Sequence, residues 1–162
     1  MSLWTKPVTG LTFDDIEQFC SQRIAEGISL DYKREIPSDL PKIASSFANT
    51  VGGWIIFGVD GDSQNLPVWP PVGIPKPNGF ADRIIQICGE GIAPSIMPAI
   101  SSVIESPTCP GVRLAVVRID QSHESPHSLR NKPRIYIRTG SVSKPIDQAD
   151  IAQIEHLIRI RG

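Results

Sequence analysis

The pattern of apolar residues is clearest over 40–59, where it predicts a helix followed by a buried strand. The helix is indicated by apolar side chains that recur along one stripe, at Leu40, Ile43, Ala44, Phe47 and Ala48. Ser38 or Asp39 can cap its start, and the pair Gly52–Gly53 can supply the positive φ at its end. The unbroken apolar run Trp54–Val59 then predicts a strand that is buried on both faces.

The residues before this stretch predict a second helix and a second strand. Thr12 and Asp15 resemble a capping box, with Asp in place of the usual Glu. The helix that follows is indicated by one apolar face, made of Phe13, Ile16, Cys20 and Ile24. Residues 28–33 alternate in polarity and predict a strand whose polar face carries Asp31 and Lys33.

Beyond the central strand, the chain predicts a loop, a helix and a hairpin. Repeated prolines over 64–79 exclude an interior strand there. We interpret Trp69 in this loop as an anchor to the core, with stacking on a nucleic-acid base as the alternative. A helix capped by Asp82 is expected to bury Ile84, Ile85, Ile87 and Cys88. Strands over 100–105 and 112–119 are expected to pair as an antiparallel hairpin.

The C-terminal part predicts one more strand and a last helix. Residues 134–138 alternate, so that Ile135 and Ile137 are expected to face inward and Arg134, Tyr136 and Arg138 outward. A last helix is expected to start at Asp147 or Asp150 and to present Ile151, Ile154, Leu157 and Ile158 as its stripe. These elements predict an α+β fold, with a mixed, mainly antiparallel sheet of about five or six strands and three or four helices.

Composition is consistent with a globular protein. The chain has 162 residues, of which 40% are hydrophobic and 20% charged. We expect a loose arm over 1–10 and a single domain over 11–162, and no apolar run reaches membrane-spanning length. The three cysteines are scattered, which favours a reducing, cytoplasmic location and argues against both a disulfide framework and a zinc cluster. His123 and His127 lack a third ligand nearby and are not interpreted as a metal site.

Charge is distributed unevenly along the chain. Residues 1–110 carry 7 Lys and Arg against 12 Asp and Glu, whereas residues 111–162 carry 9 against 5. This asymmetry predicts a polarised surface, unless the charges intermix in the fold. The basic half contains a candidate nucleic-acid-binding set in which cations surround one aromatic residue, made of Arg130, Lys132, Arg134, Tyr136, Arg138 and Lys144. Such a set suits phosphate contact and base stacking, and an ordinary exposed strand face is the alternative.

Three motifs together resemble one known family. The opening motif places Glu26 five residues before Asp31-Tyr32-Lys33. The central motif is Phe47-Ala48-Asn49-Thr50-x-Gly52-Gly53, followed by Gly58-Val59-Asp60, and the closing motif is Tyr136-Ile137-Arg138-x-Gly140-Ser141. In this order they resemble the Schlafen AlbA domain, also described as a divergent AAA family, over roughly residues 22–158. Asp31 and Tyr32 stand where the family pattern has Glu and Phe.

The resemblance implies a nucleic-acid-binding domain, regulatory or defence-related, for DNA or RNA. No base-reading helix motif is present, so we expect recognition without sequence readout. A metal-dependent endoribonuclease is the alternative, and the resemblance implies that Glu26, Asp31 and Asp60 would then be catalytic and bind magnesium or manganese, with Lys33 steadying charge on the phosphate. A solvated rim of acids is the competing interpretation of these carboxylates. A nucleotide-binding domain is a weaker alternative, because the phosphate-loop pattern G-x-x-x-x-G-K-[ST] is absent.

The resemblance also bears on partners. In Schlafen proteins two lobes of this kind pair within one chain, so a single lobe predicts a twofold homodimer. Candidate contacts are the loop around Val68 and Trp69 and the last helix, including Ile160. Nucleic acid and a second copy of the chain are therefore the expected partners, and no membrane is expected.

Overall fold

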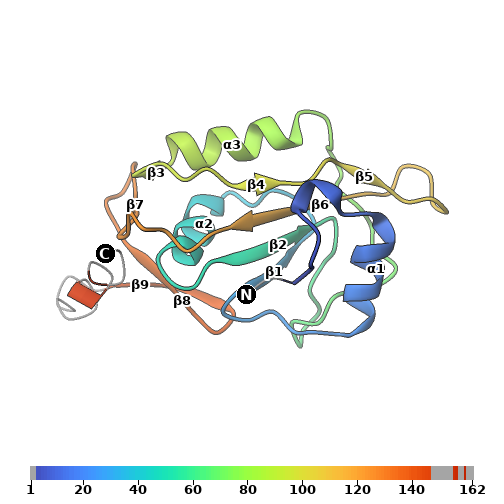
Figure 1. Cartoon of the computed structure of the whole chain (residues 1–162), viewed down its shortest axis with the longest axis horizontal. Coiled ribbons are helices and arrows are strands. Elements are labelled where there is room, and N and C mark those ends of the chain that lie inside the picture. Colours follow the sequence, from blue (N-terminus) through green and yellow to red (C-terminus); the bar gives the residue numbers. More distant parts are fainter. Residues whose placement is uncertain (1–2, 147–154, 157–158, 160–162) are drawn as a thin grey trace.

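A computed structural model describes residues 3–146, 155, 156 and 159. Its centre is a mixed five-stranded sheet in the order β1-β2-β6-β4, with β5 also paired to β6 (Figure 1). The elements of this part of the chain are η1 (Val8–Gly10), α1 (Phe13–Ser21), β1 (Leu30–Lys33), α2 (Leu40–Ala48), β2 (Gly53–Phe57), α3 (Phe80–Glu90), β3 (Ile92–Ala93), β4 (Ala99–Ile100), β5 (Ile104–Glu105), β6 (Arg113–Ile119), β7 (Ser128–Leu129), β8 (Tyr136–Thr139) and β9 (Val142–Pro145). The predicted α+β class is confirmed.

The central strand β2 is buried at all five positions, as its apolar run predicts. It pairs in parallel with β1 and antiparallel with β6. Alternate residues face opposite sides of the sheet. Ile55 and Phe57 join the core under α2 and α3, whereas Trp54 and Ile56 join the core under α1 and the N-terminal segment. Both faces of β2 are therefore covered by core side chains.

The turn from α2 into β2 depends on Gly52. Its φ is +76°, the left-handed region, as the glycine pair predicts. A Cβ at this position would lie 2.8 Å from both the Gln121 amide nitrogen and the Ile119 carbonyl oxygen. The backbone beyond β6 thus passes so close to the turn that no side chain fits between them.

The N-terminal segment is packed, so the expectation of a loose arm is wrong for residues 3–10. The Trp4 ring lies 5.2 Å from the Phe19 ring and 5.3 Å from the Trp54 ring, centroid to centroid. Val8 is buried in the same core. Burial of the Trp4 and Val8 side chains supplies apolar contact that holds this segment, although its sequence lacks the apolar periodicity of a helix or strand. The predicted capping box of Thr12 and Asp15 is confirmed.

Two details of the middle region correct the sequence interpretation. Helix α3 is preceded by Gly79 at φ +69°, so Asp82 lies within the first turn instead of capping it. Ile85 is 40% exposed, whereas Ile84 and Cys88 are buried. The first strand of the predicted hairpin is interrupted and forms β4 and β5, both antiparallel to β6.

The Pro-rich loop forms no named strand in the described residues, as the prolines predict. The Trp69 ring packs 5.7 Å from the Phe13 ring, which agrees with the core-anchor interpretation. Most of the predicted last helix lies outside the described residues. No helix in the described part is both long and apolar enough to cross a membrane.

We predict that Gly52→Ala destabilises the protein by at least about 2 kcal/mol, because it adds a close backbone contact to an unfavourable φ. Gly111→Ala is the matched control, since Gly111 has φ +86° but nothing within 4 Å of its built Cβ. It should cost only about 1 kcal/mol. If urea denaturation showed that both variants lose the same free energy of unfolding, the close contact with the 119–121 backbone would add nothing to the cost at Gly52.

Candidate nucleic-acid interface

A buried ionic cluster forms where the opening and closing motifs meet. Asp31 is 2% exposed, and its carboxylate lies 2.9 Å from Lys33 Nζ and 3.4 Å from Arg138 Nη1. The Arg138 guanidinium also donates to the carbonyl oxygens of Gly27 and Leu30, at 3.1 and 3.3 Å. Its carbon lies 4.7 Å from the centroid of the Phe47 ring. Arg138 therefore joins the β8–β9 hairpin to the first strand and to α2.

The prediction that Arg138 faces outward is wrong, because Arg138 is only 3% exposed. Arg138 pairs across the hairpin with Ser143, whose hydroxyl lies 2.8 Å from that of Ser46 on α2. Ile137 pairs with Lys144, which is exposed. Arg138 is thus the internal member of this strand, while Arg134 is exposed and Ile135, Tyr136 and Ile137 are half-buried. A guanidinium can be buried here because a carboxylate, two carbonyls and an aromatic face replace its water.

Glu26 lies beside this cluster and is half-buried. Its Oε1 accepts a hydrogen bond from the Tyr32 amide at 3.2 Å. Burial, followed by the neighbouring Asp31 carboxylate, raises the pKa of Glu26 to about 7. Glu26 and Asp31 are therefore brought together as the resemblance implies, and Lys33 is with them.

Asp60 does not complete a metal site with these two carboxylates. It follows β2 in a turn, where its carbonyl oxygen accepts from the Val68 amide at 2.8 Å. Within residues 3–146 and the three described residues beyond them, no group of three or more His, Cys, Asp or Glu side chains could hold a metal ion. Asp31 is instead neutralised by Lys33 and Arg138. The described residues do not form the three-carboxylate metal site that the resemblance implies for the nuclease alternative, and the donors present do not fit magnesium or manganese.

Asn49 of the central motif has a structural role that the sequence interpretation missed. It is fully buried at the end of α2, and its Nδ2 donates to the carbonyl oxygens of His127 and Tyr136 at 3.0 and 2.9 Å. Its Oδ1 accepts from the His127 amide at 2.7 Å. The neighbouring Thr50 hydroxyl accepts from the Arg138 amide at 2.9 Å. The sequence holds one signal for this role, since the amide side chain of Asn49 directly follows the apolar stripe of a helix.

His127 is a satisfied core residue. It is 1% exposed, with Nδ1 2.7 Å from the Pro94 carbonyl oxygen and Nε2 2.6 Å from the Ser122 hydroxyl. The carbonyl can only accept, which assigns the ring proton to Nδ1 and leaves Nε2 to accept from the serine. His123 is exposed. Both ring nitrogens of His127 are thus engaged within the protein.

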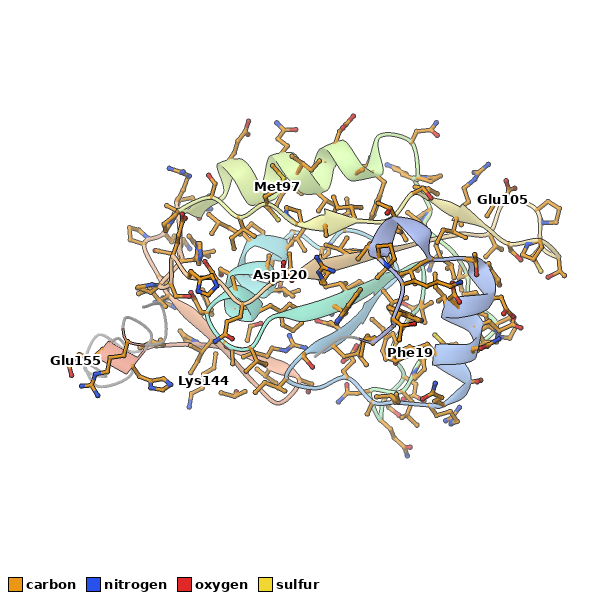
Figure 2. The ribbon with its side chains drawn as sticks, in the orientation of Figure 1. Phe19, Met97, Glu105, Asp120, Lys144 and Glu155 are labelled. Carbon is orange, nitrogen blue, oxygen red and sulfur yellow. The ribbon has the colours of Figure 1, made fainter. Side chains whose placement is uncertain are left out.

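The exposed cations of the basic segment are Arg130, Lys132, Arg134 and Lys144. Tyr136 is half-buried, and Lys42 Nζ lies 5.5 Å from the centroid of its ring. Lys42 was not among the predicted residues, although its polar position beside the α2 stripe could have indicated it. Of the predicted set, four residues are thus at the surface, one is partly covered and Arg138 is internal. Lys144 and Glu105 lie at opposite ends of the molecule (Figure 2).

Comparisons with known proteins agree with this architecture. The sequence profile of the family described as Schlafen, AlbA_2 matches residues 26–147. A solution NMR structure from Nitrosomonas europaea, the N-terminal domain of a DNA helicase RecG-related protein, is similar with a TM-score of 0.57 and 17% identity. The match covers 89% of this chain and 94% of that one. The crystal structure of the DIP2311 protein from Corynebacterium diphtheriae is similar with a TM-score of 0.54 and 16% identity, over 87% of this chain and 27% of that one.

We predict that Arg138→Ala lowers the free energy of unfolding by about 3–5 kcal/mol, because it leaves the Asp31 carboxylate buried with one partner fewer. Arg134→Ala removes an exposed cation and should change stability by less than about 0.5 kcal/mol. Urea denaturation of both variants measures the difference. If both variants lost a similar, small free energy of unfolding, Arg138 would not be holding the hairpin to the first strand and to α2.

A second prediction concerns pH. Because the pKa of Glu26 is raised in the folded protein, the folded state holds this proton more tightly than the unfolded chain. The resulting stability is complete below the ordinary pKa of 4.5 and is lost as pH rises through about 7. Glu26→Gln should therefore flatten the dependence of Tm on pH across this window. The exposed Glu17→Gln variant should follow the wild type, and parallel curves for wild type and Glu26→Gln would refute the assignment.

Proposed function

The chain belongs to the Schlafen AlbA_2 family, and from this premise we propose that it is a nucleic-acid-binding domain that contacts the phosphate backbone. The observation that carries the proposal is the group of exposed cations Arg130, Lys132, Arg134 and Lys144. Residues 130–146 contain no carboxylate, so no acid within the segment neutralises them. Clustered cations bind phosphates by releasing condensed counterions, a contribution that does not depend on sequence.

The buried cluster supports this role by fixing the cationic segment. Asn49 joins the hairpin and the loop before it to the end of α2, and Arg138 joins the hairpin to the segment before β1, over sequence separations of 78 to 111 residues. A rigid support lowers the ordering cost when several cations engage phosphates together. Tyr136 contributes less stacking than the sequence interpretation expects, because its ring is half-buried and faces Lys42.

The comparisons support the same function. One similar fold is the N-terminal domain of a protein named as related to a DNA helicase. That name concerns nucleic acid, and the family resemblance points in the same direction. We therefore propose that this chain binds DNA or RNA. The family resemblance implies that such binding serves a regulatory or defence role.

A nuclease is the second candidate, and Glu26 is the observation that favours it. A carboxyl group with a pKa of about 7 next to Asp31 and Lys33 is suited to general acid–base chemistry at neutral pH. We derive no metal-dependent step, since the donors do not fit a shared metal ion. Incubating labelled RNA and DNA with the wild type and with Glu26→Gln decides whether strand cleavage occurs and requires this carboxyl.

The expected homodimer remains a prediction. The Trp69 ring, one of its expected contacts, packs against Phe13 in the described structure. The last-helix residues Ile151, Ile154, Leu157, Ile158 and Ile160 lie outside the described residues.

We predict that the double variant Lys132→Ala/Arg134→Ala weakens DNA and RNA binding. Its salt slope should fall by about 0.7 to 0.9 for each phosphate that is no longer bound. Arg113→Ala is the control. Arg113 pairs with Glu105 at the opposite end of the molecule from Lys144 and should leave affinity unchanged (Figure 2). Fluorescence anisotropy at several salt concentrations measures both quantities, and an unchanged slope in the double variant would refute the proposed interface.

A further inference from the structure

A groove with a volume of about 660 Å³ lies along one face of α3. Arg83, Gln86, Ile87 and Glu90 line it at helical spacing, so the groove follows the helix axis. Its apolar wall is contributed by the corner before α2, by the Pro-rich loop and by α3, through Ile36, Pro37, Pro41, Ile74, Pro75 and Ile87. This size is typical of small-ligand sites, and eight of the fifteen lining residues are polar or charged.

Cations stand at both ends of the groove. At the start of α3, the Arg83 side chain donates to the Lys76 carbonyl oxygen at 2.6 Å, which holds these two residues together. Beyond the end of α3, Arg130 Nε donates to the Ile92 carbonyl oxygen at 3.1 Å. From Arg83 to its end at Glu90, the helix rises by about 10 Å along its axis. The groove therefore has cations at both ends, and the Glu90 carboxylate shares the end at which Arg130 lies.

The other polar groups of the groove are suited to the edge of a base. Glu35 and Glu90 bring carboxylates, and Asn131 brings an amide. Glu90 Oε2 already accepts from Gln86 Nε2 at 3.3 Å. Carboxylates accept from exocyclic amino groups, and amides both donate and accept, so these side chains can pair with a base but disfavour a phosphate beside them. Phosphates are thus directed to the cationic ends.

The groove is continuous with the proposed interface. Arg130 and Asn131 line it, and Lys132 and Arg134 follow directly along the chain. A base can enter such a groove only when it is unpaired, because a paired base is stacked within its duplex. We propose that the groove binds a nucleotide of a single-stranded nucleic acid, with its base on the apolar wall and flanking phosphates at Arg130 and at Lys76 and Arg83. This inference rests on the proposed nucleic-acid binding and adds strand selectivity to it.

The test compares single-stranded and duplex oligonucleotides of the same sequence, in DNA and in RNA, by fluorescence anisotropy. Ile87→Trp fills the groove, whereas Ile85→Trp adds the same ring at an exposed α3 position that does not line it. We expect wild type to prefer the single strand. Ile87→Trp should lose about tenfold in single-strand affinity, the scale of one stacked base, and keep its duplex affinity. Ile85→Trp should bind as wild type does.

Three results would overturn the inference. They are equal binding of single strand and duplex by wild type, equal single-strand affinity in both tryptophan variants, and binding of a mononucleotide or a peptide in place of the oligonucleotide. Binding of duplex alone, abolished in Lys132→Ala/Arg134→Ala, would refute the groove while leaving the proposed function intact. Binding of neither form would refute both.

Thermal unfolding monitors the fold of each variant. Should Ile87→Trp fail to fold, Lys76→Ala/Arg83→Ala replaces it. That variant should lower the single-strand salt slope and leave the duplex slope unchanged, and equal slopes for both strands would count against the groove.

Discussion

The pairing of Arg138 with Asp31 is the interaction on which the rest of the structure depends. It joins residues 107 apart in sequence and places a guanidinium between the first strand, α2 and the C-terminal hairpin. Removing both charges from water is costly, and the cost is offset here by Lys33, by two backbone carbonyls and by the face of Phe47. The three motifs that carry the family resemblance thus meet in one internal cluster, which positions the cationic hairpin.

Local periodicity explains why much of the fold is predictable. The stripe from Leu40 to Ala48, the buried run of β2 and the capping box at Thr12 each depend on residues close in sequence. The alternation over 134–138 could not show that Arg138 turns inward, because its partner Asp31 lies on the first strand. The packed Trp4 escaped prediction for the same reason, since its contacts are with Phe19 and Trp54.

The candidate site was predictable only in part. A run of cations without acids indicates an exposed surface, and Arg130, Lys132 and Arg134 are indeed at the surface. The meeting of Glu26, Asp31 and Lys33 also followed from the motif. Asp60 forms no metal-binding group with them in the described residues, although the adjacent Gly61 lies against the Glu26 carboxylate. The groove along α3 was not foreseen, since its walls come from four separate stretches of sequence.

The β8–β9 hairpin forms a two-stranded sheet of its own and is joined to the body mainly through side chains. Closing contacts across such long stretches of chain carries an entropic cost that grows with loop length. A ligand that binds the cationic surface of the folded chain will, by mass action, lower the population of states in which the C-terminal hairpin has opened.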